Sequence, residues 1–194
     1  MGGSRRISDR LGAQTYLVAL GSNMRHPRHG PPRRVLKAAM AALHGNGLDC
    51  AAASPIIETA PIGPSQRRFA NAACLVRTDL VPEAMLERLH AIESAFGRRR
   101  MGIRWRARVL DLDIILWSGG FHAGPGLTIP HIAFRERAFV LAPARRIAGT
   151  WRDPIGGLTV QQLFARLTKP HPLRRGSNVV GPLAQSVEQL TFNQ

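Results

Sequence analysis

Residues 109–117 read Val-Leu-Asp-Leu-Asp-Ile-Ile-Leu-Trp, an apolar segment that two carboxylates interrupt. Successive side chains of a strand point to opposite faces, so Asp111 and Asp113 are expected to share one face. The opposite face should be apolar and carry Leu110, Leu112, Ile114 and Leu116. Two residues along a strand span about 7 Å, which lets both carboxylates reach one cation or a closely spaced pair. The alternative is that both aspartates only face solvent, although aspartate is a poor strand former.

The segments around this strand predict an α+β fold. Further strands are expected at residues 16–20, 50–59 and 69–78. Helices with an apolar stripe should begin at Pro32 and Pro82 and end at Gly45 and Gly97, because proline suits a first helical turn and glycine ends a helix. The resulting order is that of the ferredoxin-like split βαβ sandwich, an antiparallel sheet with helices packed on one face. Residues 127–167 should add a loop and one or two short helices.

The composition is typical of a globular protein. The chain has 194 residues, of which 44% are hydrophobic and 20% charged. We expect a single domain over residues 15–170, a flexible N-terminal arm at residues 1–14 and a disordered tail at residues 171–194. No apolar run approaches the ~18 residues of a membrane span, and none resembles a signal peptide, so we expect a cytoplasmic protein with no membrane partner. Its two cysteines are too few for a cysteine-rich zinc site.

The formal net charge is +15, and the densest cluster of basic residues lies at one place in the sequence. Residues 98–108 contain six arginines and no acidic residue, namely Arg98, Arg99, Arg100, Arg104, Arg106 and Arg108. Such a cluster predicts an anion site for polyphosphate or nucleic acid. Two aspartates follow directly, and carboxylate oxygens suit Mg²⁺. Arginines beside a magnesium site are the two parts that phosphoryl transfer requires, although the P-loop motif is missing from the sequence.

Six short blocks occur in an order typical of one enzyme family. They are Ala19-Leu20-Gly21-Ser22-Asn23, Thr59-Ala60-Pro61-Ile62-Gly63, Phe69-Ala70-Asn71-Ala72, Ile92-Glu93 with Gly97-Arg98, Arg108-Val109-Leu110-Asp111-Leu112-Asp113-Ile114, and Ile129-Pro130-His131 with Arg137 and Phe139. Together they resemble the 6-hydroxymethyl-7,8-dihydropterin pyrophosphokinase family of folate biosynthesis, over residues 15 to about 165. The resemblance implies a ferredoxin-like enzyme that transfers the β,γ-diphosphate of ATP to the pterin hydroxymethyl group and releases AMP.

The resemblance also implies which residues hold the metal and the phosphates. Asp111 and Asp113 would bind two Mg²⁺ ions, with ATP as co-substrate. Arg98 and Arg108 would be the catalytic arginines that close over the reacting phosphates. Further contacts near the triphosphate would come from Arg100, His131 and Arg137, and Trp105 would help to seal the closed site. Adenine and ribose would lie near Glu93, Ile114 and Thr128.

The implied pterin site uses two aromatic rings and an amide. Phe69 and Phe139 would sandwich the flat pterin, and Asn71 would read its edge. The other edge contacts would come from Thr59 and from the segment around Pro61 and Ile62. Because Phe69 and Asn71 are two residues apart, strand alternation should place both on one face. A flat ring system with polar edges requires such an arrangement.

Two other functions remain open from the residues alone. A basic RNA-binding module on the same scaffold would use the arginines on phosphates, but it would carry stacking aromatics where this chain has Asp111 and Asp113. A palm-type nucleotidyl transferase would also place two aspartates on a ferredoxin-like sheet. We favour the pyrophosphokinase, acting as a monomer on ATP and hydroxymethyl-dihydropterin, with no nucleic acid as partner.

The last residues suggest an origin outside the protein. Residues 181–194 can be back-translated as the D-arm and the anticodon arm of a lysine transfer RNA gene. We therefore hypothesise that the reading frame runs into such a gene, so that these residues were never selected as protein. The alternative is an ordinary short amphipathic helix.

Overall fold

The computed structural model describes residues 13–60, 67–97 and 109–170. In this part of the chain, five strands form one antiparallel sheet: β1 (Gln14–Ser22), β2 (Asp49–Ala53), β3 (Ile57–Thr59), β4 (Phe69–Thr78) and β5 (Asp111–Trp117). The order is β2-β4-β1-β5, and β3 pairs with the half of β4 that β2 does not reach. This order confirms the split βαβ fold. Strand β1 begins inside the predicted N-terminal arm, while residues 1–12 and the predicted tail lie outside the described residues.

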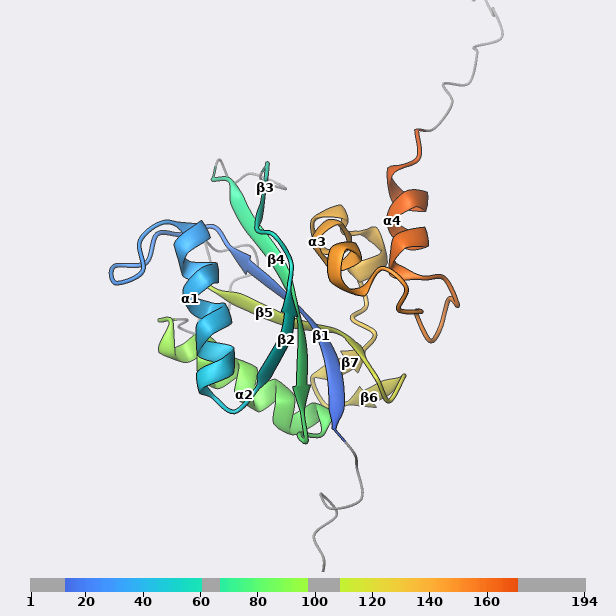
Figure 1. Ribbon diagram of the computed structural model, residues 1–194, viewed down its shortest axis with the longest axis horizontal. Coiled ribbons are helices and arrows are strands. Elements are labelled where there is room, and N and C mark those ends of the chain that lie inside the picture. The colour runs from blue at the N-terminus through green and yellow to red at the C-terminus, as the bar shows by residue number, and fades with distance from the viewer. Residues whose placement is uncertain (1–12, 61–66, 98–108, 171–194) are drawn as a thin grey trace, which may run out of the picture.

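Helices α1 (Pro32–Gly45) and α2 (Pro82–Ala95) cover one face of the sheet, as expected (Figure 1). Both begin with a proline, whose missing N–H costs nothing in a first turn. Each helix buries residues three or four apart against the sheet. In α1 these are Val35, Leu36, Ala39 and Leu43, and in α2 they include Met85, Leu89 and Ile92. The periodicity of the sequence therefore predicted these two helices correctly.

The opposite face of the sheet is covered as well, which the sequence did not predict. A short 3₁₀ helix, η2 (Phe134–Glu136), leads into α3 (Ala138–Ala148) and α4 (Val160–Thr168), which lie on this second face (Figure 1). Apolar residues from β1, β5, α3 and α4 form a core there. Strand β1 is therefore buried on both faces, with Val18 in the first core and Leu17 in the second. A small hairpin, β6 (His122–Gly124) with β7 (Leu127–Ile129), precedes these helices.

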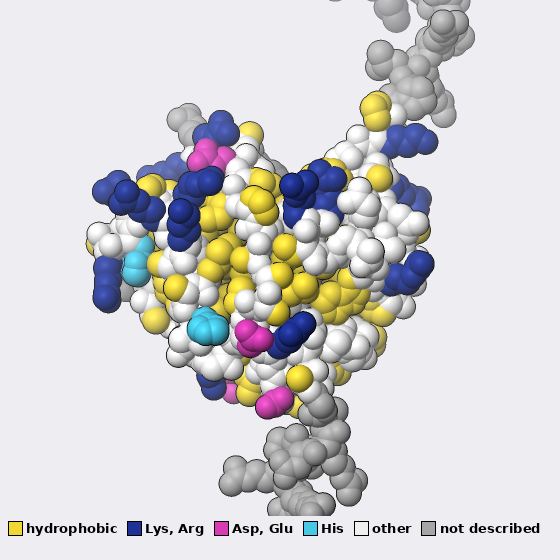
Figure 2. All heavy atoms as spheres, viewed as in Figure 1, with side chains coloured by type: hydrophobic (Ala, Val, Ile, Leu, Met, Phe, Trp, Pro, Cys, Tyr) yellow, Lys and Arg dark blue, Asp and Glu magenta, His cyan; other side chains and the backbone are white. Residues whose placement is uncertain are grey.

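Basic side chains surround the face of the molecule seen in Figure 2, and apolar side chains occupy its middle. The positive charges of that face are therefore spread along its rim. Among the described residues, no helix has both the length and the apolar character that a membrane span requires.

The pairing of β5 with β1 contains one extra residue on the β5 side. Leu17 pairs with Leu116 and Val18 pairs with Ile114, so Ile115 forms a β-bulge between them. Ile114 lies in the first core, whereas Ile115 and Leu116 both lie in the second core. The predicted common face of Leu116 with Leu110, Leu112 and Ile114 is therefore wrong, because the bulge shifts the alternation by one residue. The carbonyl of Ile115 accepts a hydrogen bond from the His131 backbone N–H at 3.1 Å.

A buried ion pair joins η2 to the turn before α4. The Asp153 side chain is fully buried, and its two oxygens accept hydrogen bonds from Nε and Nη2 of Arg135, each at 2.7 Å. The backbone N–H of Ile155 also donates to Asp153 Oδ1, at 3.1 Å. Burial by itself raises the pKa of the Asp153 carboxyl, but the hydrogen bonds and the positive charge of Arg135 outweigh it and lower that pKa. The pair therefore stabilises the charged form of Asp153.

We expect Asp153→Asn to lower the free energy of unfolding by about 2 to 3 kcal/mol at neutral pH, because a buried pair loses one charge. The folded-state pKa lies below the ordinary value of about 3.9, so the stabilisation is complete above that value and is lost as the pH falls below it. Urea unfolding at pH 7 and near pH 3 should show the difference between wild type and variant shrinking at the lower pH. A difference independent of pH would contradict the ionic origin.

Candidate active site

One row of residues crosses three strands at the end of the sheet where β4 and β5 begin. Gly21 of β1 pairs with Asn71 of β4 on one side and with Asp111 of β5 on the other. A Cβ atom placed on Gly21 would lie 3.8 Å from Asn71 Oδ1 and 3.9 Å from Asp111 Cβ. Asn71 and Asp111 therefore stand on the same face, with Gly21 as the floor between them. The missing side chain leaves room for a ligand that touches both.

The next row along the sheet brings in the second carboxylate. Ala19 pairs with Ala73 on β4 and with Asp113 on β5, so the floor beside Asp113 also consists of small side chains. The side chain of Asp113 is 35% exposed. Asp111 is likewise only partly buried, and both lie on the face that η2 and α3 approach. The predicted common face of the two aspartates is confirmed.

These carboxylates form a pair and not a larger cluster. Within residues 13–60, 67–97 and 109–170, no group of three or more His, Cys, Asp or Glu side chains could hold a metal ion. Two carboxylates suit Mg²⁺, which usually takes one or two protein carboxylates and completes its shell with water and phosphate oxygens. The donor set thus fits magnesium that arrives with a nucleotide better than a structural zinc.

A hollow of about 580 Å³ adjoins Asp113. Four residues predicted to bind nucleotide or phosphate line it together: Ile114, Thr128, His131 and Arg137. They come from β5, β7, the loop after β7 and the start of α3, so the fold assembles them from separate segments. The sequence analysis missed His90 and Leu86, which line the same hollow from α2. Leu86 and His90 are four residues apart on the helix that carries Glu93, so they lie on one face of that helix. This spacing was the sequence signal that could have revealed them.

Arg137 stands between the carboxylates and an aromatic ring. Its Nη1 lies 4.0 Å from Asp113 Oδ2, and its Cζ lies 5.9 Å from the centre of the Phe139 ring. The side chain is 38% exposed, so the guanidinium keeps donors available for an anion. His131 is oriented by its own loop, because its Nδ1 accepts a hydrogen bond from the Ala133 backbone N–H at 3.2 Å. This hydrogen bond orients the imidazole ring through Nδ1, and Nε2 is the second polar atom of the ring.

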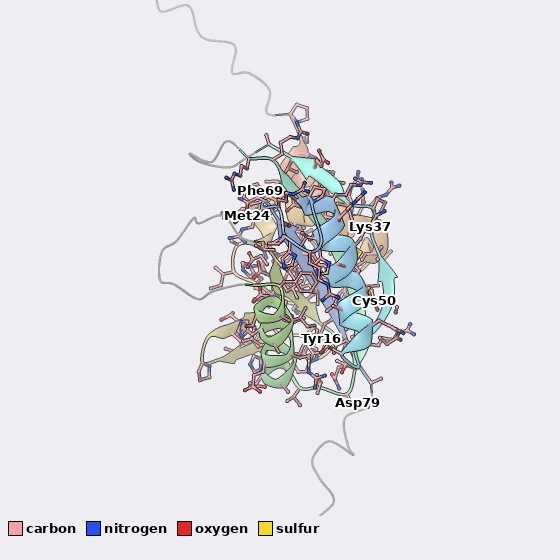
Figure 3. The ribbon with its side chains drawn as sticks, turned by 90° about the vertical axis from the view of Figure 1, so that its left-hand side faces the viewer. Tyr16, Met24, Lys37, Cys50, Phe69 and Asp79 are labelled. Atoms are coloured by element: carbon pink, nitrogen blue, oxygen red, sulfur yellow. The ribbon has the colours of Figure 1, made fainter. Side chains whose placement is uncertain are left out.

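The residues predicted to read the pterin edge are joined to each other. Asn71 Nδ2 donates to Thr59 Oγ1 at 2.9 Å, across the β3–β4 pair. Phe69 lies at the start of β4, at the end of the molecule where Met24 also lies (Figure 3). Phe139 lies in the first turn of α3, which packs against β3 and β4. The sandwich of a pterin between these two rings stays a prediction.

Glu93 has a place of its own in this arrangement. Its side chain is 1% exposed, and its Oε1 accepts a hydrogen bond from the Leu112 backbone N–H at 2.8 Å. Leu112 lies between Asp111 and Asp113, so this bond ties α2 to β5 at the aspartate pair. The placement of Glu93 near adenine and ribose stays a prediction. Six other predicted site residues lie outside the described residues: Pro61, Ile62, Arg98, Arg100, Trp105 and Arg108.

Comparison with protein-family models matches residues 17–149 to 7,8-dihydro-6-hydroxymethylpterin-pyrophosphokinase (HPPK). The chain belongs to the HPPK family. It is 35% identical over 170 residues to the 2-amino-4-hydroxy-6-hydroxymethyldihydropteridine pyrophosphokinase of Synechocystis sp., covering 86% of this chain and 84% of that protein. It is 39% identical over 145 residues to the enzyme of the same name from Pseudomonas aeruginosa, covering 74% of this chain and 86% of that one.

The fold of this HPPK is shared with a longer protein of known structure. The HPPK-DHPS of Plasmodium falciparum matches with a TM-score of 0.62 at 14% sequence identity, over 82% of this chain. This chain spans 42% of that protein's length. The family-model match and the two relatives confirm the resemblance inferred from the six sequence blocks.

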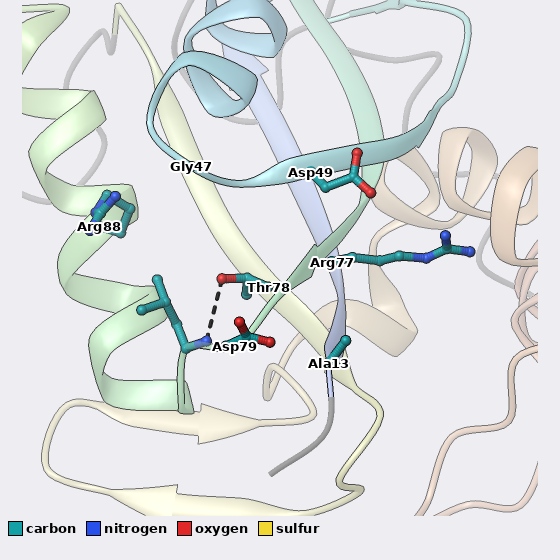
Figure 4. Close-up of a pocket in the computed structure, with 8 residues that line it drawn as sticks. Ala13, Gly47, Asp49, Arg77, Thr78, Asp79 and Arg88 are labelled. Carbon is teal, nitrogen blue, oxygen red and sulfur yellow. Dashed lines mark hydrogen bonds between the residues drawn. The ribbon is translucent and has the colours of Figure 1, made fainter. Parts of the chain in front are cut away.

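A second hollow in this HPPK, of about 510 Å³, lies at the other end of the sheet (Figure 4). Side chains of both charges line it, including Asp49, Asp79, Arg77 and Arg88. In Figure 3, Asp79 lies at the end of the molecule opposite to Phe69. This hollow is therefore remote from the aspartate pair and is not part of the active site.

We expect Glu93→Ala to lower the free energy of unfolding by about 2 kcal/mol, because the buried Leu112 N–H would lose its acceptor. Glu93→Gln retains a side-chain oxygen and should cost about 1 kcal/mol or less. Urea denaturation followed by circular dichroism measures both. Glu87→Ala, on the exposed side of the same helix, is the matched control and should change stability by no more than about 0.5 kcal/mol. Equal stability of Glu93→Ala and Glu87→Ala would refute the proposed tie.

Proposed function

We propose that the row formed by Asn71, Gly21 and Asp111 is where this HPPK brings its two substrates together. The family reaction transfers the diphosphate of ATP to 6-hydroxymethyl-7,8-dihydropterin, giving AMP and the pterin diphosphate in folate synthesis. The observation that carries the proposal is the juxtaposition across Gly21 of an edge-reading amide and a metal-binding carboxylate. A pterin bonded to Asn71 would thereby have its hydroxymethyl group directed toward the phosphates at Asp111.

Asp111 and Asp113 would hold two Mg²⁺ ions in this site. Bound Mg²⁺ neutralises phosphate oxygens and polarises the hydroxyl that attacks. The chain's contribution is to keep both carboxylates on one face at about 7 Å spacing, which the bond between Glu93 and Leu112 supports. Positioning and charge neutralisation provide most of the catalysis in phosphoryl transfer, so this rigidity has a direct kinetic value.

The hollow beside Asp113 would receive the nucleotide. Ile114 and Thr128 would contact the adenine and ribose, and Glu93 would lie close behind them. His131 and Arg137 would bind the triphosphate, and Arg137 lies between Asp113 and Phe139. Arg100 and Trp105 would complete the nucleotide site. Arg98 and Arg108 would stabilise the charge of the transferred group in the transition state, where guanidinium groups are most effective.

The pterin would lie between the rings of Phe69 and Phe139. The linked pair of Thr59 and Asn71 would bind its polar edge, together with the backbone near Pro61 and Ile62. Asn71 is 4% exposed, so its donor and acceptor are fixed before the ligand arrives, which reduces the entropy cost of binding. We further propose that the protein acts as a monomer in the cytoplasm, with ATP and the pterin as its partners.

The test of this function is an assay of the purified protein with ATP and Mg²⁺, with and without 6-hydroxymethyl-7,8-dihydropterin. We expect AMP to form only when the pterin is present. Release of diphosphate from ATP without pterin would instead support a nucleotidyl transferase. Tight RNA binding with no AMP formation would support the RNA-binding module.

We also expect Asp111→Asn and Asp113→Asn each to lower kcat at least about 100-fold, because a neutral amide holds Mg²⁺ poorly. The thermal unfolding temperature should change little, since both side chains are partly exposed on the face of the sheet that η2 and α3 approach. Asp79→Asn, in the hollow at the far end of the sheet, is the matched control and should retain full activity. Activity within a few-fold of wild type in either aspartate variant would rule out the metal assignment.

A further inference from the structure

The segment from His131 to Phe139 contains three of the residues assigned to substrates: His131, Arg137 and Phe139. Its first residue is attached to the sheet through the carbonyl of the Ile115 bulge. Its last turn is attached to α3, where the backbone N–H groups of Val140 and Leu141 donate to the Arg137 carbonyl, each at 3.0 Å. Between these two attachments lies η2, which contains Arg135.

Arg135 is held by a partner that comes from far along the chain. Asp153 is fully buried and binds Arg135 through two parallel hydrogen bonds of 2.7 Å, the strongest geometry available to this pair. The Arg135 guanidinium also lies 4.8 Å from the centre of the Phe134 ring, and Phe134 is fully buried. These contacts fix both the plane of the Arg135 guanidinium group and the direction in which it points.

The turn around Asp153 is built to hold this carboxylate in place. The Ile155 N–H donates to its Oδ1, and the Asp153 backbone pairs with Leu158 and Gly157 at 2.9 Å each. A Cβ atom on Gly156 would come within 2.7 Å of Asp153 Oδ2, so the turn closes tightly over the side chain. Thr159, which follows the turn, caps α4. The carboxylate therefore has a fixed position relative to the second-face helices.

We infer that Asp153, acting through Arg135, is a positioning residue that sets the Arg137 guanidinium against Asp113 and so prepares the site for the nucleotide phosphates. Arg137 is two residues from Arg135, and its own contacts are loose: 4.0 Å to Asp113 and 5.9 Å to the Phe139 ring. Its direction therefore depends on its backbone, and the Arg135–Asp153 pair restrains that backbone. This inference rests on the proposed role of Arg137 in binding ATP.

Packing alone does not require a charged pair at this position. Replacement of a buried ion pair by apolar residues of similar size is often neutral or stabilising. What the pair adds is a directed bidentate contact, which restrains rotation of η2 in a way that apolar contacts do not. A directed restraint is useful next to residues that must meet a phosphate group to within about 1 Å.

The test compares the kinetics of four single variants and one double variant of the full chain with wild type. Asp153→Asn and Arg135→Lys weaken the Arg135–Asp153 ion pair, and Arg137→Ala removes the residue that this pair positions. Leu163→Ala is the matched control. Leu163 is buried on α4, so its replacement lowers the stability of the same helical layer without altering the Arg135–Asp153 ion pair. KM for ATP and kcat are measured at a temperature where circular dichroism shows each variant folded, and unfolding temperatures are recorded in parallel.

We expect Asp153→Asn to lower kcat/KM for ATP about tenfold or more, chiefly through KM. Arg135→Lys keeps the charge without the bidentate contact and should show a smaller loss; it also serves if Asp153→Asn does not fold. Leu163→Ala should lower the unfolding temperature and leave KM unchanged. Asp153→Asn combined with Arg137→Ala should be no worse for KM than Arg137→Ala alone, because both changes remove the same contact.

Three results would overturn the inference. If Arg135→Lys and every folded Asp153 variant keep the wild-type KM while Arg137→Ala does not, the pair has only a structural role and the proposed function stands. If Leu163→Ala raises KM as much as Asp153→Asn, the effect follows from stability and not from positioning. If Arg137→Ala itself leaves KM and kcat unchanged, the proposed role of Arg137 fails, and the inference fails with it.

Discussion

The extra residue at Ile115 is the constraint on which the arrangement of this HPPK depends. Up to this bulge, β5 alternates regularly, so Asp111 and Asp113 point to the ligand face while their apolar neighbours pack beneath α2. At the bulge, the pairing with β1 shifts by one residue, and the carbonyl of Ile115 accepts a hydrogen bond from the His131 N–H. One irregularity thus ends the segment that carries Asp111 and Asp113 and attaches the segment to which we assign the phosphate and pterin contacts. A bulge beside an active site commonly redirects side chains in this way.

Small side chains on the central strand provide the second requirement. Gly21 and Ala19 lie between the β4 residues and the aspartates, so the ligand face at this end of the sheet is open. Elsewhere β1 is packed on both faces. The sheet can therefore be rigid throughout most of its length and still receive substrates at one end. Functional residues on strands of this kind are placed more accurately than residues on loops.

The second layer of helices combines stability with function. Helices α3 and α4 bury the face of β1 and β5 that α1 and α2 leave uncovered. The residue that precedes α3, Arg137, lies beside Asp113, and Phe139 in the first turn of α3 lies beside Arg137. The Arg135–Asp153 pair joins the two roles, because it links the turn before α4 to the segment to which we assign substrate contacts. Packing of the far layer and geometry of the site are consequently coupled through one buried contact.

Local patterns in the sequence were sufficient for much of this molecule. The stripes of α1 and α2, their proline starts and the alternation around Asp111 and Asp113 depend only on the repeat of a helix or a strand. The ordered motifs identified the family, and they singled out Ile114, Thr128, His131 and Arg137, which line the hollow beside Asp113. The position of the bulge could not be predicted from the local sequence, because Ile114, Ile115 and Leu116 are all apolar and no alternation marks the extra residue. The tertiary structure alone paired Arg135 with Asp153, aligned Asn71 with Asp111 across Gly21 and brought His90 to the hollow beside Asp113. These contacts join residues that are distant in sequence and meet only when the layers pack.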